Sequence, residues 1–362
     1  MADQKGHLDR LGISSAIVSH DHKIDLKDIL GASIIFTTPE SLQTPAFRKV
    51  LLNKDFKQRV CAFACDEAHC VSQWGENFRP EYLEVSSIRS IIDVSFLALT
   101  ATATQQVLDD IRGKLLLKDD AITVAMVPNR PNIFMAIEKG SADMEEEIKW
   151  FKDYLESTPN WKKTVIFCRS YNAVYAVWSY LVDTLSITPE DNNRTAEMFH
   201  SACDDLTKDR ILTEFKKDDS KIRIIVSTVA FGMGISIPDV DIVIHWGAPK
   251  NALSYWQEVG RAGRNGQLSL AVVKAYPRSL MKNITEESMR KIVGSDVCSR
   301  KQILKNLLTD GMDENDIPQA QLCAENNCDI CDCQKCMCCR ICWTECVCNG
   351  KMDYTNRFLY CS

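Results

Sequence analysis

Short apolar runs alternate along the chain with stretches that have the spacing of amphipathic helices. The runs that predict strands are residues 34–39, 60–65, 96–100, 123–128, 133–139, 164–169, 222–228, 241–246 and 270–276. Helical spacing is found at residues 144–155, 171–182, 206–217 and 253–264. Because continuous apolar strands separated by helices are typical of parallel sheets covered on both faces, the pattern predicts an α/β fold.

The alternating pattern occurs twice, on either side of the proline-containing segment 128–132. Proline biases its neighbours away from helix, so we expect two α/β domains joined at this segment. After about residue 279 the strand signal stops; residues 286–308 have helical spacing, 309–318 form an acidic loop, and a cysteine cluster follows. The predicted domains are residues 1–130 and 131–285, then a small cysteine-containing module at 286–348 and a tail at 349–362.

Composition adds to this picture mainly by exclusion. The 362 residues contain no apolar run of about 18 that would cross a bilayer, and no apolar segment that predicts a secretory signal, so we expect an intracellular protein. A net charge of −6 argues against a general polycationic coat for nucleic acid. A local binding groove stays open as an interpretation, because affinity follows the charges that meet phosphates.

The 17 cysteines are unevenly distributed, and ten of them lie between Cys323 and Cys348. Five others lie before residue 210 in mostly apolar contexts, where cysteine packs as a small hydrophobic side chain. In a reducing compartment, a dense cysteine cluster indicates metal ligands before it indicates disulfides.

Asp66 and Glu67 follow a predicted strand and precede His69. They lie at the carboxyl end of that strand, where open α/β sheets bind ligands. An aspartate in this place holds Mg²⁺ through its water shell, and a neighbouring glutamate orients and deprotonates an attacking water. The alternative, an acidic strand end that only caps the next helix, fits the tetrapeptide about equally well.

Arg261 and Arg264 are three residues apart, on one face of the predicted helix 253–264. An arginine at a domain edge can reach a γ-phosphate and neutralise the charge that develops during transfer. The alternative is a pair of solvated arginines. Gly260 and Gly263 favour the functional interpretation, because glycine weakens a helix by about 1 kcal/mol unless packing requires it.

Two other strand ends have residues suited to phosphate. Thr228 is followed by Gly232 and Gly234, which let backbone amides approach an anion, although a tight turn is an equal alternative. Thr100 and Thr102 end another strand, where a helix N-cap is the competing interpretation and is compatible with function.

These segments, in this order, resemble the RecQ family of superfamily-two DNA helicases. The matching stretches are IIFTTPES, DEAH, SQWGENFRPEYLEV, LALTATAT, PNRPNI, TVIFCRSYNAV, STVAFGMGISIPDVDIVIHWGAPK and SYWQEVGRAGRNG. The resemblance extends to about residue 331. It implies two RecA-like parallel-sheet domains, the first incomplete, with a small helical zinc-binding module. It also implies an ATP-dependent 3′–5′ DNA helicase of repair and recombination that uses ATP, Mg²⁺ and Zn²⁺, binds single-stranded and duplex DNA, and is nuclear.

The resemblance also implies roles for single residues of the first domain. Asp66 would hold Mg²⁺, Glu67 would act as the catalytic base, and His69 would link the nucleotide site to the DNA site. Thr100 and Thr102 would couple ATP to strand movement. An aromatic-rich loop would sense single-stranded DNA by base stacking, through Ser72, Gln73, Trp74, Phe78 and Arg79.

In the second domain, the resemblance assigns Arg169, Thr228 and the Gly232–Gly234 backbone to the DNA path or the interdomain cleft. Gln257, Gly260, Arg261 and Arg264 would face the nucleotide, with Arg264 as the arginine finger. His200 matches a family element to which we assign no role.

The implied zinc ligands are Cys298, Cys323, Cys328 and Cys331, four thiolates that would make a closed structural site. The cysteines at 333–348 depart from the family. They could bind a second metal, exchange with the first set of ligands, or belong to an oxidation-prone extension.

The phosphate loop GxxxxGK[ST] does not occur in this sequence, and the first 19 residues resemble the motif that normally follows it. We therefore expect a chain that begins partway through the first domain. Two hypotheses remain for its activity: a RecQ-type helicase, or an inactive DNA-binding or regulatory module. A cysteine-based metal store is a third, weaker hypothesis.

Overall fold

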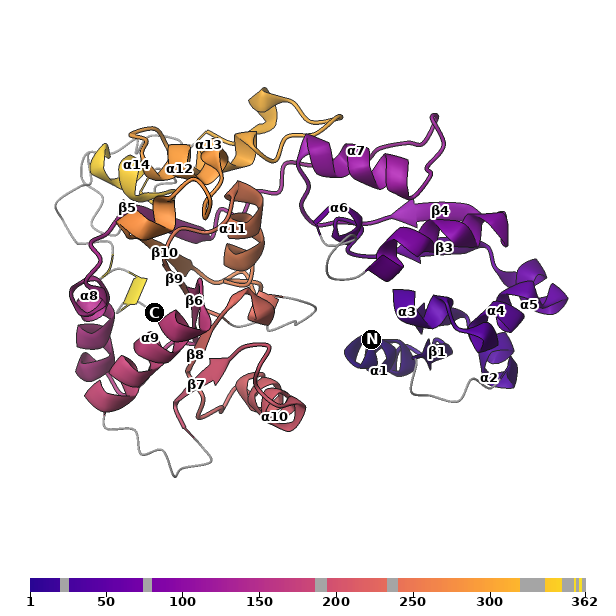
Figure 1. Ribbon diagram of the computed structural model, residues 1–362, viewed down its shortest axis with the longest axis horizontal. Coiled ribbons are helices and arrows are strands. Elements are labelled where there is room, and N and C mark those ends of the chain that lie inside the picture. The colour runs from indigo at the N-terminus through magenta and orange to yellow at the C-terminus, as the bar shows by residue number, and fades with distance from the viewer. Residues whose placement is uncertain are drawn as a thin grey trace. The chain divides into compact units, whose positions relative to one another are not determined.

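The computed structural model describes residues 1–19, 26–73, 80–185, 194–232, 240–319, 336–346, 355 and 358–359 (Figure 1). The chain divides into two compact units. The first consists of Met1–Ala125 with Thr309–Gly311, and the second of Met126–Leu308 with Met312–Ser362. Within the described ranges, no helix is both long and apolar enough to span a membrane.

The first unit contains two separate pairs of parallel strands. β1 (Ser15–Val18) pairs with β2 (Ile34–Thr37), and β3 (Ala62–Cys65) pairs with β4 (Ser95–Ala98). Its helices are α1 (Ala2–Arg10), α2 (Leu26–Gly31), α3 (Pro39–Leu42), α4 (Pro45–Leu52), α5 (Lys54–Arg59), α6 (Cys70–Gln73), η1 (Pro80–Ser90) and α7 (Gln105–Lys114).

Side chains fix where several of these helices begin. Thr38, Thr44 and Thr104 each accept a hydrogen bond from the backbone N–H three residues later, as Asn53 does for α5. Such N-caps satisfy amides that have no partner within the helix. The expectation that the 100–104 segment caps a helix is thus met by Thr104, which leaves Thr100 and Thr102 for other contacts.

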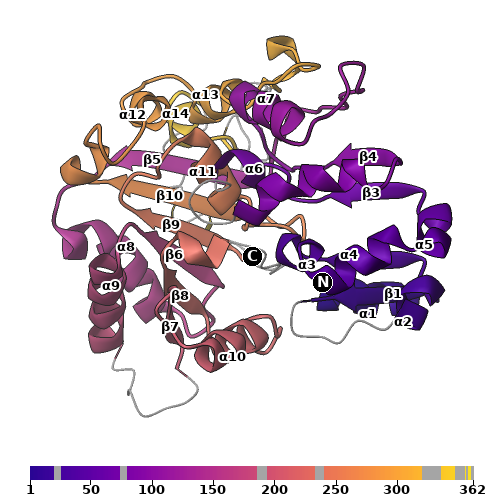
Figure 2. The ribbon, with the colours of Figure 1, turned by 45° about the vertical axis from the view of Figure 1, so that its right-hand side comes forward.

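The second unit is built on one six-stranded parallel sheet with the order β5-β10-β9-β6-β8-β7 (Figure 2). The strands are β5 (Ile133–Lys139), β6 (Thr164–Cys168), β7 (Ala196–Phe199), β8 (Ile224–Ser227), β9 (Ile242–Trp246) and β10 (Ser269–Ala275). The helices are α8 (Met144–Ser157), α9 (Tyr171–Thr184), α10 (Asp205–Phe215), η2 (Val229–Gly232), α11 (Ala252–Val259), η3 (Pro277–Leu280), α12 (Glu287–Val293), α13 (Ser299–Lys305), η4 (Glu314–Asp316) and α14 (Arg340–Thr344).

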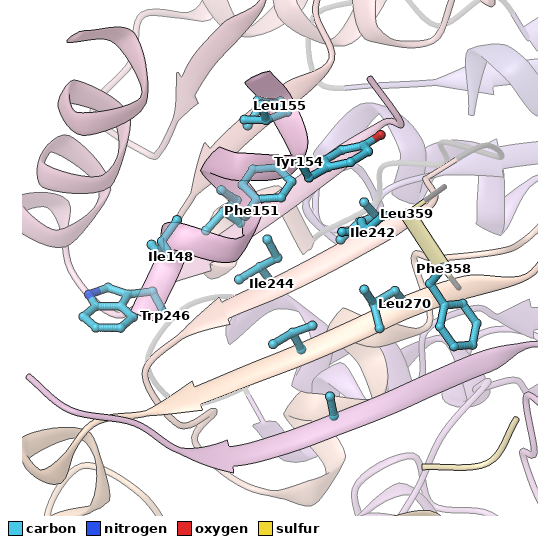
Figure 3. Packing of buried hydrophobic residues seen from close by; sticks show 14 of the residues in the cluster. Ile148, Phe151, Tyr154, Leu155, Ile242, Ile244, Trp246, Leu270, Phe358 and Leu359 are labelled. Atoms are coloured by element: carbon cyan, nitrogen blue, oxygen red, sulfur yellow. The ribbon is translucent and has the colours of Figure 1, made fainter. Parts of the chain in front are cut away.

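Helices cover both faces of this sheet, as the buried strand pattern predicts. On one face, α8 directs Ile148, Phe151, Tyr154 and Leu155 toward Ile242, Ile244 and Leu270 of the strands (Figure 3). Each fully buried side chain of this size contributes about 1.5–3 kcal/mol. On the other face, the rings of Phe167 and Tyr255 lie 5.3 and 5.4 Å from that of His245, which places α11 there.

The structure confirms most of the predicted strands, and it corrects three elements. Residues 123–128 form no strand and pair with no described strand, and Ile122, Val124 and Met126 are 91%, 91% and 81% exposed. The predicted helix 253–264 ends at Val259. The predicted helix 286–308 is two helices, α12 and α13, interrupted after Val293.

Candidate active site

The pairing of β3 with β4 places the segment 66–69 beside the segment 99–102. Cys65 and Ala98 are register partners at the carboxyl ends of the two strands. Beyond them, Leu99 N–H donates to the Cys65 carbonyl at 2.9 Å, and Ala68 N–H donates to the Leu99 carbonyl at 2.8 Å. Two sequence segments about 30 residues apart therefore form one edge of the first unit.

Asp66 and Glu67 are both exposed at this edge. Glu67 has a φ of +50°, in the left-handed region that non-glycine residues rarely occupy. Its N–H donates to Asp66 Oδ1 at 2.8 Å, which holds the turn in place. Backbone strain of this kind is concentrated at functional sites. Two exposed carboxylates at a strand end also fit the oxygen ligands that Mg²⁺ requires.

His69 is buried behind the two carboxylates and connects the two segments. Its Nδ1 lies 3.0 Å from Thr100 Oγ1 and 3.3 Å from Glu67 Oε2. Thr100 has a single hydroxyl proton, which it donates to the Thr102 carbonyl at 2.9 Å. Thr100 Oγ1 therefore accepts from His69, and the imidazole proton is assigned to Nδ1.

Burial lowers the pKa of His69 below its ordinary value of 6.5, against the opposing effect of Glu67 and Asp66. The imidazole is therefore neutral at neutral pH, and its Nδ1–H points at Thr100. The His69 ring contacts Glu67 on one side and Thr100 on the other, and Thr100 contacts Thr102. The position of Glu67 therefore depends on the positions of Thr100 and Thr102.

Ser72 lies one helical turn further on, in α6. Its hydroxyl donates to Asp110 Oδ2 at 2.5 Å, and Lys114 Nζ donates to the carbonyl of Val71 at 3.0 Å. Both contacts tie α6 to α7. Gln73 is the last residue of α6. Trp74, Phe78 and Arg79 lie outside the described residues, so their predicted contacts with DNA remain predictions.

In the second unit, the loop 260–266 follows α11 and is fixed by the segment before β5. Arg130 donates to the carbonyls of Gly260, Ala262 and Gly263 at 3.3, 2.8 and 2.8 Å. Asn132 Nδ2 donates to the carbonyls of Gly263 and Gln267 at 2.8 and 2.9 Å. The resemblance placed both segments among the family motifs, and the structure packs them against each other.

Arg261 and Arg264 are in this loop and not on a helical face, which corrects the sequence prediction. The helix ends before them because Gly260 and Gly263 follow Val259, and Gly263 has a φ of +58°. Arg264 is exposed, and its Nε donates to the Gly260 carbonyl at 3.3 Å. Burial, and secondarily the charge of Arg264, lower the pKa of Arg130.

Gln257 is half-buried on α11, beside a buried pair that sequence reasoning missed. Glu258 Oε2 lies 2.8 Å from His245 Nε2, and the two residues are 8% and 2% exposed. A polar residue inside the apolar strand IVIHW was the available signal. The pair fixes α11, which leads into the arginine loop, against β9.

The other predicted site residues of the second unit lie at separate places in the fold, and some lie outside the described residues. Arg169 Nη2 donates to the Ile284 carbonyl at 2.7 Å, a contact that orders the chain after β10. Thr228 follows β8 and is half-buried, and Gly232 ends η2. Gly234, Cys323, Cys328 and Cys331 lie outside the described residues. Cys298 is the N-cap residue of α13.

Comparison with known protein families assigns both units. A model of the DEAD/DEAH box helicases matches residues 2–111, and a model of the helicase conserved C-terminal domain matches residues 146–266. The first range contains Asp66, Glu67 and Thr100, and the second contains the arginine loop.

Several curated proteins align with most of the chain. It is 34% identical over 251 residues to the ATP-dependent helicase wrn-1 of Caenorhabditis elegans, covering 68% of this chain and 22% of that protein. It is 29% identical over 356 residues to the ATP-dependent DNA helicase RecQ of Haemophilus influenzae, covering 91% and 53%. It is 29% identical over 301 residues to the probable ATP-dependent DNA helicase RecS of Bacillus subtilis, covering 80% and 57%. The chain spans about half or less of the length of the first two relatives and 57% of the third.

Solved structures share the fold. The helicase Lhr of Mycobacterium smegmatis, bound to ssDNA and AMP-PNP, matches with a TM-score of 0.56 at 19% identity, covering 83% of this chain and 39% of that chain. The DEAD-box helicase Mss116, bound to ssRNA and UDP-BeF, matches with a TM-score of 0.61 at 17% identity, covering 87% and 65%. The predicted α/β class with RecA-like parallel sheets is confirmed.

Proposed function

The chain belongs to the RecQ family of helicases, and from this premise we propose that it is motor machinery of an ATP-dependent 3′–5′ DNA helicase. Its role would be to unwind DNA in repair and recombination, in the nucleus. One observation carries the proposal: the hydrogen bond between His69 and Thr100 joins the carboxylate turn to the 100–102 segment. Coupling of ATP hydrolysis to movement along DNA requires a contact between the residues that act on ATP and the segment that responds, and this hydrogen bond is such a contact.

The carboxylates supply the chemistry on the first unit. Asp66 would hold Mg²⁺ through bound water, and Mg²⁺ would neutralise the phosphate charge of ATP. Glu67, with its carboxylate exposed, would orient the attacking water and accept its proton. His69 cannot compete as a base through Nδ1, because that nitrogen carries the proton donated to Thr100.

The arginine loop supplies positive charge on the second unit. Arg264 is exposed, as an arginine finger must be to reach a γ-phosphate, and the Arg130 contacts hold its backbone in one conformation. Preorganised charge is the largest contribution to phosphoryl transfer, because it requires no rearrangement during the reaction. Gln257 would contact the nucleotide from the last turn of α11.

A second candidate function is favoured by one feature of the sequence. The 362 residues contain no GxxxxGK[ST], the loop whose amides and lysine hold the β- and γ-phosphates. The chain would then bind single-stranded or duplex DNA, or regulate a partner, without hydrolysing ATP.

ATP turnover by the 362-residue chain, with and without single-stranded DNA, separates the two candidates. The helicase proposal expects DNA-stimulated turnover that Glu67→Gln removes and that Glu146→Gln, an exposed change on α8, leaves intact. Unwinding of a 3′-tailed but not a 5′-tailed duplex would support the stated polarity. Retained DNA binding with no turnover in any variant would favour the second candidate.

A further inference from the structure

One buried arginine of the second unit lies outside the residues to which the family resemblance gives a role. Arg300, in the first turn of α13, is 5% exposed. A guanidinium is always charged in proteins, so its burial is costly unless hydrogen bonds compensate it. α13 packs against both β5 and α11, the helix that leads into the arginine loop, residues 260–266 (Figure 1).

Both terminal nitrogens of Arg300 bind the segment that enters β5. Nη1 donates to Asn129 Oδ1 at 3.1 Å and to the Arg130 carbonyl at 2.6 Å. Nη2 donates to the carbonyl of Ile133 and, at 3.2 Å, to that of Cys338. Three of these four acceptors belong to the segment before β5 or to the first residue of that strand. The planar guanidinium therefore fixes this segment at both of its ends.

Arg130 connects Arg300 with the arginine loop. Its carbonyl accepts from Arg300, while its own guanidinium donates to three carbonyls of the loop at 2.8 to 3.3 Å. Pro131 follows directly, and the residue before a proline is biased toward extended conformations. Because the Arg130 backbone has little freedom, the direction of its side chain depends on where Arg300 holds that backbone.

The hydrogen bonds of Arg300 are not needed to keep β5 in the sheet. β5 pairs with β10 along its whole length. The bonds act instead on the residues before the strand, which α11 also contacts, since Trp256 Nε1 donates to the Pro128 carbonyl at 2.9 Å. This short segment thus lies between α13 on one side and α11 with the arginine loop on the other.

We propose that Arg300 is a positioning residue for Arg264, acting through Arg130 on the backbone of the arginine loop. The inference rests on the proposed function, in which Arg264 meets the γ-phosphate of ATP. Arg300 keeps the loop in one conformation, so that the charge of Arg264 needs no rearrangement during phosphoryl transfer. A misplacement of about 1 Å in a catalytic group can cost about a hundredfold in rate.

Hydrogen exchange of the loop tests the proposal without any ATP turnover. The amides of Ala262 and Gly263 are protected, because they donate to the carbonyls of Val259 and Val240, both at 2.9 Å. In Arg300→Gln these amides should exchange about tenfold faster than in wild type, through local opening of the loop. The amides of β9 should be unchanged, which shows that the unit is folded.

Arg290→Gln is the matched control. Arg290 is a half-buried arginine of the neighbouring helix α12, and its Nε donates to the Thr285 carbonyl at 3.0 Å. This change should leave exchange of the loop as in wild type. The proposal is overturned if Arg300→Gln leaves loop exchange unchanged, or if the control accelerates it equally.

ATP turnover then tests whether the effect passes through Arg264. Arg300→Gln should lower DNA-stimulated kcat about ten- to hundredfold with little change in KM. In an Arg264→Ala background the same change should have no further effect on kcat, whereas two independent effects would add. Additive losses would therefore exclude action through Arg264. A wild-type chain without turnover would refute the proposed function, and the exchange experiment would still decide whether Arg300 positions the loop.

Two further measurements keep the test decisive if Arg300→Gln does not fold. Arg300→Lys keeps the buried charge but not the planar fork, so the loop should still exchange faster than in wild type. In the wild-type chain at rising urea, the loop should lose protection no later than α13. A loop as protected in the lysine variant as in wild type, or one that stays protected after α13 has opened, would contradict the proposal.

Discussion

His69 Nδ1 donates a hydrogen bond of 3.0 Å to Thr100 Oγ1, across two strand ends that are 31 residues apart in sequence. The Thr100 hydroxyl in turn donates a hydrogen bond to the Thr102 carbonyl at 2.9 Å, so the three residues form a chain of two hydrogen bonds. Because His69 Nδ1 also lies 3.3 Å from Glu67 Oε2, His69 connects the base proposed for ATP hydrolysis with the segment proposed to respond to it.

Thr100→Val should weaken this coupling. Valine keeps the shape of threonine but removes the acceptor at 3.0 Å, and the loss of a buried hydrogen bond costs about 1–3 kcal/mol. At 1.4 kcal/mol per factor of ten, DNA-stimulated ATP turnover should fall about tenfold or more. Thr100→Ser keeps the hydroxyl and should retain most of the activity. Equal turnover by the valine and serine variants would contradict the role of the bond.

The pH dependence of stability follows from the lowered pKa of His69. In the unfolded chain the imidazole takes up a proton near its ordinary 6.5, and in the folded chain only at lower pH. Between the two values the unfolded state binds more protons, so the free energy of unfolding falls as pH decreases below about 6.5. Above about pH 6.5, His69 does not make the free energy of unfolding depend on pH.

Urea unfolding of the first unit, followed by hydrogen exchange of residues 62–72 between pH 7.5 and 5, measures this effect. His69→Asn should show a shallower loss of stability on acidification than the wild-type chain. His7→Asn changes an exposed histidine in the same unit and leaves His69 in place, so it should keep the wild-type slope. A His69→Asn slope equal to that of wild type would exclude His69 as the source.

The strands that sequence patterns predicted well are those buried on both faces. β5 coincides with the predicted run 133–139, β9 begins one residue later than predicted, and β10 begins and ends one residue earlier than predicted. β1 and β7 were not predicted. The pattern of β7 is interrupted by the charged Glu197, which is buried with Arg210 as its partner at 2.8 Å. Residues 123–128 have the right composition for a strand but no neighbouring strand, which periodicity alone does not reveal.

The part of the candidate site that could be predicted from the sequence is the part that lies at the carboxyl ends of predicted strands. The meeting of the Asp66–His69 turn with Thr100 follows from parallel pairing of two predicted strands. The convergence of Cys338, Cys339 and Cys342 on Cys298, with all four sulfurs within 4.8 Å of one another, did not follow from the sequence, because it depends on the packing of β5 and α13. Spacing along the chain contains no information on that contact.

Gly263→Ala should destabilise the second unit more than Gly266→Ala. Both glycines have positive φ, +58° and +87°, so alanine strains either backbone by about 1–2 kcal/mol. Of the two glycines, only Gly263 has neighbours that an added Cβ would collide with: Asn132 Nδ2 and, at 2.7 Å, Ser269 Oγ. At Gly266 nothing lies within 4 Å.

We expect urea unfolding to show a loss of about 1–2 kcal/mol for Gly266→Ala and about 2–4 kcal/mol for Gly263→Ala. Gly263→Ala should also lower ATP turnover, because it displaces the backbone next to Arg264. Equal losses in the two variants would show that the packing of Asn132 against the loop contributes nothing.

The buried pair of His245 and Glu258 should be needed to hold α11 in place. His245 Nε2 donates to Glu258 Oε2 at 2.8 Å, while Nδ1 has no hydrogen-bond partner. Glu258→Ala therefore leaves the imidazole with no partner at either nitrogen, at a cost of about 1–3 kcal/mol from the lost bond. Glu258→Gln keeps an acceptor and should cost less than about 1 kcal/mol.

The double variant His245→Phe with Glu258→Leu separates positioning from stability. Replacing both members of a buried polar pair by apolar residues is often neutral for stability, so its urea midpoint should exceed that of Glu258→Ala. If the pair orients α11 for the arginine loop, ATP turnover should stay low in the double variant even where stability is recovered. Turnover that recovers together with stability would assign the pair to packing alone.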